Sequence, residues 1–125
     1  MRVGFTGTRY GMTERQKQLL RDKLLELMPD EIHHGDCVGA DEQCHKIAHE
    51  LKIKVLIHPP IDSFNRAFCE SPYMFEPKPY LDRNKDIACL SDVLIGCPDN
   101  RTISGTRYTL NYAERMGKTT IIILP

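Results

Sequence analysis

Short apolar segments alternate along this chain with segments of helical periodicity, and this alternation restricts the fold more than any other feature. The apolar segments, expected to form strands, span residues 3–6, 31–34, 55–58, 93–97 and 119–124. The helical patterns between them span residues 13–28, 40–51, 80–90 and 109–116. Such alternation is typical of a parallel sheet covered by helices on both faces. We therefore expect an α/β, three-layer domain whose five parallel strands have the order 3-2-1-4-5.

The last expected strand contains the longest apolar run of the chain, Ile121 to Leu124. An unbroken apolar strand is typical of burial on both faces of a parallel sheet. The run is far too short to cross a bilayer, so no association with a membrane is expected.

Composition indicates one globular domain over residues 1–125. The chain is 41% hydrophobic and 27% charged, as ordinary globular domains are. Its 17 basic and 17 acidic side chains balance, which argues against a dedicated nucleic-acid-binding protein. Five cysteines, an odd number, fit free thiols in a reducing compartment. Because the chain opens directly on a strand pattern instead of a signal peptide, we expect a cytoplasmic protein.

Residues 59–79 interrupt the alternation with a Pro-rich segment. It contains five prolines and, without a clear period, the aromatic residues Phe64, Phe68, Tyr73 and Phe75. A loop of this length inside a domain is usually functional or mobile. Two interpretations stay open. The segment is a lid that stacks Tyr73, Phe75 or Tyr80 on a base, or it is a surface excursion or a contact between subunits.

The segment HHGDCVGADEQCH, residues 33–45, has the composition of a metal site. Metal ligands on one helix face lie about three or four residues apart, a condition that His45 and His49 meet. Cys44 instead falls on the apolar face of the helix pattern, where we expect a core thiol. The two histidines share the solvent-facing side, and no CxxC pair or HExxH motif accompanies them. The sequence therefore favours surface histidines, and no metal or cofactor is expected.

The same segment also has the features of a turn between a strand and a helix. In parallel sheets, ligands bind beyond the carboxyl ends of strands, where helix N-termini attract phosphates. Gly35 and Gly39 would let the backbone approach an anion or adopt a positive φ. Asp36 or Asp41 would cap the helix or bind sugar hydroxyls. A glycine pair alone fits a purely structural turn equally well.

A repeated tetrapeptide strengthens the ligand-binding interpretation. GTRY occurs at residues 7–10 and 105–108, after the first and fourth expected strands. In the order 3-2-1-4-5 these strands are neighbours at the topological switch point. We therefore expect both GTRY loops and the GDCVGAD turn to converge on one crevice. There their hydroxyls and the guanidinium groups of Arg9 and Arg107 would bind a phosphate or a ribose phosphate.

The motifs HHGDCVGAD, DRNKDIACLSDVLIGCP and SGTRYTLNYAERMGK resemble those of the SLOG superfamily, which includes DprA and the Lonely Guy phosphoribohydrolases. The chain is most similar to the small YspA/YpsA-like branch, except at residues 59–79. The resemblance implies a Rossmann-like fold, a nucleotide-type ligand and assembly as a homo-oligomer. By motif it assigns ligand binding to Gly7, Thr8, Arg9, Gly35, Gly39, Asp41, Arg83, Asn84, Gly105 and Thr106. The turns themselves add Asp36, Ser104 and Arg107.

The chain departs from this superfamily at the residues that would carry out a reaction. Lonely Guy enzymes carry PGGxGTxxE, whose glutamate acts at the ribose, whereas this chain has NRTIS before its GT and Thr109 at the glutamate position. Cleavage of an N-glycosidic bond builds positive charge on the sugar, so a nearby carboxylate is needed. Glu114 lies two turns into the helix, too far from the loop. The remaining candidates are Asp36, Asp41 and Asp82 as carboxylates, with Asp41 and Arg83 as the main catalytic candidates.

Three functions fit these observations, in decreasing order of support. The first is binding of a nucleoside phosphate or an ADP-ribose-like ligand, as a sensor, a sequestering protein or an enzyme. The second is an N-glycosidase, or phosphoribohydrolase, that acts on nucleoside monophosphates. The third is DprA-like binding of single-stranded DNA, which needs a continuous positive groove with stacking aromatic side chains. Its cations would be Arg66, Lys78, Arg83, Lys85, Arg101 and Arg107.

Overall fold

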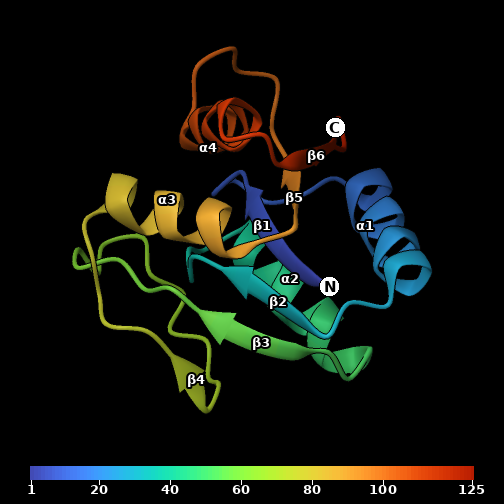
Figure 1. Ribbon diagram of the computed structural model, residues 1–125, viewed down its shortest axis with the longest axis horizontal. Coiled ribbons are helices and arrows are strands. Elements are labelled where there is room, and N and C mark those ends of the chain that lie inside the picture. The colour runs from blue at the N-terminus through green and yellow to red at the C-terminus, as the bar shows by residue number, and fades with distance from the viewer.

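Six parallel strands form the central sheet of the computed structural model, which describes residues 1–125 (Figure 1). The strands are β1 (Arg2–Gly7), β2 (Glu31–His34), β3 (Lys54–Ile57), β4 (Tyr73–Met74), β5 (Val93–Cys97) and β6 (Thr119–Ile122). They lie in the order β4-β3-β2-β1-β5-β6, and every neighbouring pair is parallel. The helices are α1 (Glu14–Leu27), α2 (Ala40–Glu50), α3 (Tyr80–Leu90) and α4 (Gly105–Arg115).

Two hydrophobic cores lie on opposite faces of the sheet. The larger core has 16 buried residues and joins α1 and α2 to the strands. The smaller core has five buried residues, which come from α3, α4 and Leu94 of β5. Successive strand side chains point to opposite faces, so Leu94 enters the smaller core while Val93 and Ile95 enter the larger one. The expected three-layer α/β architecture is therefore present.

The expected strand order is right for five strands, but the sheet has a sixth. Strands β3, β2, β1, β5 and β6 follow the order 3-2-1-4-5. The extra strand, β4, comes from the Pro-rich segment and pairs Tyr73 and Met74 with Leu56 and Ile57 of β3. A strand of two residues is too short to produce the alternating pattern by which strands are recognised, so the sequence did not predict it.

Strand β6 is not buried on both faces, as its apolar run had led us to expect. It lies at the edge of the sheet and pairs only with β5. Thr119 and Ile122 are exposed, and Ile123, just after the strand, is the buried residue of this run. An apolar run therefore does not separate an edge strand from a central one. No helix of the chain has the length and apolar character needed to span a membrane.

Helix α4 begins at Gly105, four residues before the predicted start. Ser104 caps it, because the Ser104 hydroxyl accepts a hydrogen bond from the Arg107 N–H at 3.2 Å. The inward side of its first turn carries Thr106 and Thr109, which are buried but polar, so the apolar periodicity starts later than the helix. The second GTRY sequence is consequently the first turn of a helix and not a loop.

Candidate functional site

A pocket with a volume of about 290 Å³ lies beyond the carboxyl ends of the neighbouring strands β1 and β5. Its walls come from the loop after β1, the turn after β2, the start of α3 and the start of α4. Nine of the thirteen predicted ligand-binding residues line it: Gly7, Thr8, Arg9, Gly35, Asp41, Arg83, Asn84, Gly105 and Thr106. The three segments that were expected to converge therefore meet at one pocket, although the second GTRY segment enters it as the first turn of α4 and not as a loop.

Four predicted residues lie outside the pocket lining. Gly39 packs against the loop after β1, with φ of 86°, and a Cβ there would overlap the Arg9 carbonyl. Ser104 uses its hydroxyl to cap α4. The Arg107 side chain turns back and its Nε donates to the Arg101 carbonyl at 3.4 Å. Two GTRY sequences that differ in secondary structure thus aim their arginines differently, and only Arg9 lines the pocket.

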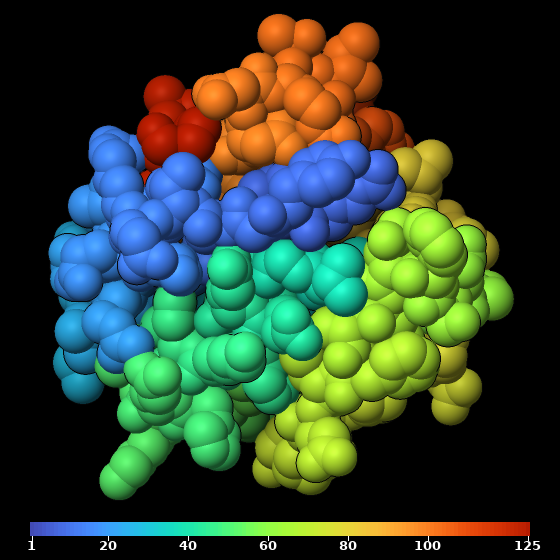
Figure 2. Space-filling model, turned by 180° about the vertical axis from the view of Figure 1, so that it is seen from behind, coloured from blue at the N-terminus to red at the C-terminus, as the bar shows by residue number.

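Asp36, the fourth of these residues, anchors the Pro-rich segment. It is completely buried, and its carboxylate accepts from Arg66 Nε and from the Cys69 N–H, both at 2.8 Å. Its carbonyl accepts from the Ala67 N–H, also at 2.8 Å. The anchored segment protrudes as the yellow-green surface beside the turn after β2 in Figure 2. These contacts occupy Asp36 and leave it unavailable to a ligand.

The Pro-rich segment contributes Asn65 to the pocket, next to Tyr80 at the start of α3. Tyr73 and Phe75 do not line the pocket, and the Phe75 ring stacks on His58 at a centroid distance of 4.2 Å. Of the three aromatic residues considered for stacking on a base, only Tyr80 is therefore in place. Sequence reasoning did not assign six other pocket residues to the site: Phe5, Thr6, Cys37, Asn65, Ile87 and Arg101.

Helical spacing could have identified part of this set. Tyr80, Arg83, Asn84 and Ile87 are related by steps of three or four residues along α3, so one face of that helix carries all four into the pocket. The family motif predicted Arg83 and Asn84 as ligand-binding residues, and the helical spacing adds Ile87 and supports Tyr80. Asn65 and Arg101 lie in irregular segments, where no periodicity marks a residue as pocket-lining.

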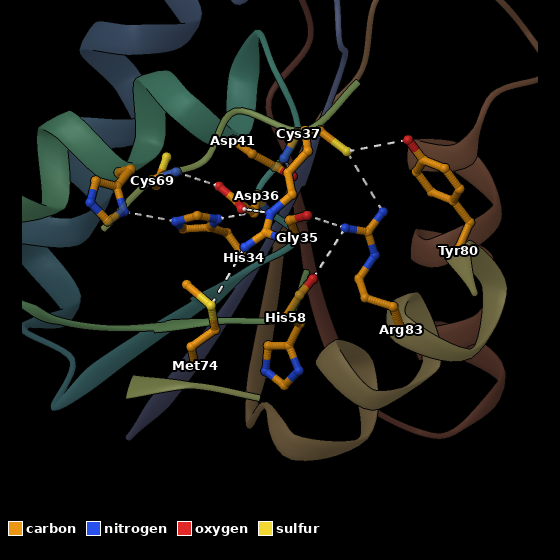
Figure 3. A network of polar contacts seen from close by, with 12 residues as sticks. His34, Gly35, Asp36, Cys37, Asp41, His58, Cys69, Met74, Tyr80 and Arg83 are labelled. Atoms are coloured by element: carbon orange, nitrogen blue, oxygen red, sulfur yellow. Dashed lines mark hydrogen bonds and ion pairs between the residues drawn. The ribbon is translucent and has the colours of Figure 1, made fainter. Parts of the chain in front are cut away.

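Arg83 forms the inner wall of the pocket and is only 4% exposed. Its Nη1 donates to the carbonyl of Gly35 and, at 3.3 Å, to that of His58 (Figure 3). Its Nη2 lies 3.7 Å from the Cys37 sulfur, and the guanidinium carbon lies 4.9 Å from the centre of the Tyr80 ring. The Nε is buried without a hydrogen-bond partner. A Cβ at position 35 would overlap the guanidinium group, which explains the glycine there.

Asp41 is the one carboxylate that lines the pocket. It is 6% exposed, and it accepts a hydrogen bond from the Cys37 N–H at 3.2 Å. Burial raises its pKa to about 6, and the nearby Arg83 partly offsets that rise. The Asp41 carboxyl can consequently hold or release a proton near neutral pH.

The outer end of the pocket carries two exposed guanidinium groups beside one aromatic ring. Arg9 and Arg101 each place their guanidinium carbon 5.0 Å from the centre of the Tyr10 ring. Asp99 Oδ2 accepts from Arg101 Nε at 2.9 Å and from the Thr8 hydroxyl at 2.8 Å. The hydrogen bond from Arg101 is the main reason why the pKa of Asp99 is lowered to about 2.

The start of α4 adds backbone donors to this outer end. Gly105 and Thr106 line the pocket, and the first N–H groups of a helix have no partner within it. No acidic residue lies in the first turn of α4 to neutralise the partial positive charge of the helix end. The amides at the start of α4 and the side chains of Arg9 and Arg101 therefore form a surface suited to an anion.

We had expected both His45 and His49 on the solvent-facing side of α2. His49 is exposed, and Cys44 is buried as predicted, but His45 is only partly exposed. The His45 Nδ1 lies 2.9 Å from Nε2 of the buried His34, and the Cys69 sulfur lies within 4.8 Å of both rings' ligand atoms. These three residues come from β2, α2 and the Pro-rich segment, so sequence spacing could not reveal the cluster.

Hydrogen bonding opposes metal coordination at this cluster. The Asp36 N–H donates to His34 Nδ1 at 2.9 Å, so His34 carries its proton on Nε2 and donates it to His45 Nδ1. To bind a metal, His34 Nε2 would have to lose its proton and offer a lone pair. The lone pair of Nδ1 is already used to accept the hydrogen bond from Asp36. The neutral ring cannot provide both lone pairs. Burial lowers the pKa of His34 to about 3, which keeps the ring neutral in the folded protein.

Comparison with known proteins finds a shared fold. No protein-family model matches the chain, and no curated protein matches it. Among solved structures, the molybdenum cofactor binding protein from the phototrophic bacterium Rippkaea orientalis is similar, with a TM-score of 0.77 and 18% sequence identity. The match covers 99% of this chain and 76% of that one. At this identity the likeness establishes the α/β fold that the two proteins have in common.

Proposed function

We propose that this protein binds a small phosphorylated ligand of the nucleotide class in the pocket at the carboxyl end of the sheet. The observation that carries the proposal is the convergence of the α4 N-terminus with Arg9 and Arg101 at one end of that pocket. Helix N-termini and guanidinium groups are the common protein donors to phosphate. The resemblance to the SLOG superfamily supports a nucleotide-type ligand and assembly as a homo-oligomer.

The other end of the pocket suits a planar ring. Tyr80 offers an aromatic face, and the side-chain amides of Asn65 and Asn84 can donate and accept hydrogen bonds at a ring edge. The volume of about 290 Å³ is at the lower limit of small-molecule sites, which start at about 300 Å³. A ligand the size of a mononucleotide therefore fits better than a larger ADP-ribose-like molecule.

The structural similarity suggests a second candidate ligand for the pocket, with chemistry like that of a nucleotide. The molybdenum cofactor is a phosphorylated heterocycle, so it would use the same arrangement of an anion end and a ring end. The structurally similar protein is described as binding that cofactor. A ligand screen of this chain should therefore include phosphorylated pterins beside nucleotides.

Thermal-shift measurements test the proposal. Nucleoside 5′-monophosphates at millimolar concentration should raise the Tm of the wild-type protein, because a ligand that binds only the folded state stabilises it. Arg9→Ala and Arg101→Ala should each remove most of the rise. Arg115→Ala, which removes an arginine from the far end of α4, is the matched control and should keep it. A wild-type protein that responds to no nucleotide and no phosphorylated pterin would contradict the proposal.

Cleavage of the ligand is a second candidate function, and the pocket position of Asp41 favours it. A carboxyl with a pKa of about 6 can act as a general acid or base near neutral pH. Asp36 is engaged with the Pro-rich segment, and neither Asp82 nor Glu114 lines the pocket. Release of free base from nucleoside monophosphates, followed by chromatography, should be lost in Asp41→Asn. Binding without base release would leave the protein a sensor or a sequestering protein.

DprA-like DNA binding has less support, because most of the cations proposed for it have other partners. Arg66 pairs with Asp36, and Lys78 pairs with Asp86 at 2.6 Å. Arg83 is buried in the pocket wall. A continuous positive groove would need these side chains free at the surface. A gel shift with single-stranded oligonucleotides at low salt would reveal such binding if it occurs.

A further inference from the structure

Asp99 lies directly behind the outer end of the pocket and touches two of its lining residues. Its carboxylate accepts from Arg101 Nε at 2.9 Å, from the Arg101 backbone N–H at 2.9 Å and from the Thr8 hydroxyl at 2.8 Å. Arg101 therefore points one edge of its guanidinium group at Asp99 and has less of its charge available to a ligand. Asp99 does not line the pocket, so its effect on a ligand is exerted through these neighbours and through its charge.

The charges around the pocket nearly match those of one phosphate group. Arg9, Arg83 and Arg101 contribute three positive charges, and Asp41 and Asp99 contribute two negative charges, which leaves 3 − 2 = +1. The N-terminus of α4 adds about +0.5. A phosphomonoester carries about −1.5 to −2 at neutral pH. Each further phosphate would bring negative charge that no remaining cation of the pocket offsets.

Space at the outer end does not limit the number of phosphates. Arg9 and Arg101 are both exposed, and Tyr10 between them is 67% exposed. A second phosphate would extend from the pocket past these side chains into solvent. Selection at this end therefore has to come from charge.

We propose that Asp99 is a specificity-determining residue that makes the pocket select ligands with a single phosphate over ligands with two or three. Asp99 acts by holding the Arg101 guanidinium and by repelling additional phosphate groups. This inference rests on the proposed function, because it concerns the ligand of the same pocket.

The test compares affinities for ligands that differ in one phosphate. Isothermal titration calorimetry at low salt and without divalent cations would use AMP, GMP, ADP and GDP with the wild type and Asp99→Asn. The amide can still accept from the Thr8 hydroxyl, but it carries no charge. We expect the wild type to prefer the monophosphates. Asp99→Asn should shift the ratio of diphosphate to monophosphate affinity by about tenfold in favour of the diphosphates. That shift should shrink as salt is added.

A matched control removes the same charge elsewhere. Asp92→Asn also deprives an arginine of a carboxylate, because Asp92 pairs with Arg2 at 3.5 Å. This pair lies where β1 and β5 begin, at the opposite end of the strands from the pocket. Asp92→Asn should leave the affinity ratio unchanged. Asp99→Glu, which restores the charge, should recover the wild-type preference.

The outcomes separate this inference from the proposed function. Wild-type protein that binds diphosphates as tightly as monophosphates, or an Asp99→Asn variant with an unchanged ratio, would overturn the role of Asp99 and leave nucleotide binding intact. A wild-type protein that binds none of the four nucleotides would remove nucleotide binding and the role of Asp99 together.

Discussion

The inner wall of the pocket and its outer end, called the rim below, both contain arginines. The arginine of the wall is buried, whereas those of the rim are exposed. On the inner wall, Arg83 is 4% exposed and its guanidinium group is fixed by two backbone carbonyls. At the outer rim, Arg9 and Arg101 are exposed and lie beside the ring of Tyr10. The comparison indicates that Arg83 stabilises the walls of the pocket, whereas the rim arginines are available to a ligand. The same residue type thus stabilises the fold in one region and, under the proposed function, would bind the ligand in the other.

Replacement of Arg83 should give the largest loss of stability. Arg83→Ala leaves the Gly35 and His58 carbonyls without their donor and Asp41 without a nearby cation. We expect the free energy of unfolding to fall by about 3 kcal/mol or more. Arg101→Ala should lower the free energy of unfolding far less, because its ion pair is exposed. Urea denaturation of both variants checks this difference, and equal losses would contradict the distinction between wall and rim.

Acidification should destabilise the interior near the wall and spare the rim. Burial lowers the pKa of His34 and of His58 to about 3, so the unfolded chain binds more protons below pH 6.5 and stability falls as pH decreases. Asp41, with its pKa raised to about 6, has the opposite effect over part of this range. The net loss between pH 6.5 and pH 5 should be about 2 kcal/mol. Asp99, with a pKa of about 2, does not titrate there. Denaturation curves that coincide at the two pH values would disprove the expectation.

Two glycines provide a smaller and more local comparison. Gly35→Ala would push a methyl group into the Arg83 guanidinium and should cost about 1–2 kcal/mol of stability. Gly105, at the rim, has no atom within 4 Å of where a Cβ would be. Gly105→Ala should therefore change the free energy of unfolding by less than about 0.5 kcal/mol. Chemical denaturation of the pair measures the difference, and a Gly105→Ala variant as unstable as Gly35→Ala would show that the rim is packed like the wall.

The smallest expected effect concerns the ring between the rim arginines. Tyr10→Ala removes two cation–π contacts, which are weak because they lie at an exposed site. Nucleoside monophosphate affinity should fall by about threefold, because Arg9 and Arg101 lose a surface that positions them. Tm without nucleotide should stay within about 1 °C of the wild type. Calorimetric titration resolves a change of this size, and unchanged affinity would mean that the ring does not position the arginines.

The sequence predicted residues of both the inner wall and the rim, but it misplaced one rim arginine, and the reason is local. Gly35, Asp41 and Arg83 belong to motifs that begin or follow regular elements, so their place at the ends of the strands could be inferred. At the rim, the prediction placed Arg107 where the structure has Arg101. A helix turns by about 100° per residue, so the early start of α4 moves the Arg107 side chain away from the face that Thr106 occupies.

Contacts between distant segments could not be predicted from the sequence either. One such feature is the cluster of His34, His45 and Cys69, which joins β2, α2 and the Pro-rich segment. Another is the pairing of the two-residue strand β4 with β3. Such features depend on how an irregular segment packs, and no periodicity encodes that. The order of the five longer strands could be predicted, because chain connectivity and the preference for right-handed crossovers restrict it.

The anchoring of the Pro-rich segment by Asp36 has a consequence for binding kinetics. This one buried residue accepts hydrogen bonds from Arg66, Ala67 and Cys69. The neighbouring Asn65 is therefore held in the pocket wall before any ligand arrives. Displacement of the segment would leave a buried carboxylate without its partners, which is costly. Association should therefore proceed in a single step whose rate rises linearly with nucleotide concentration, without the plateau that a slow opening step would impose.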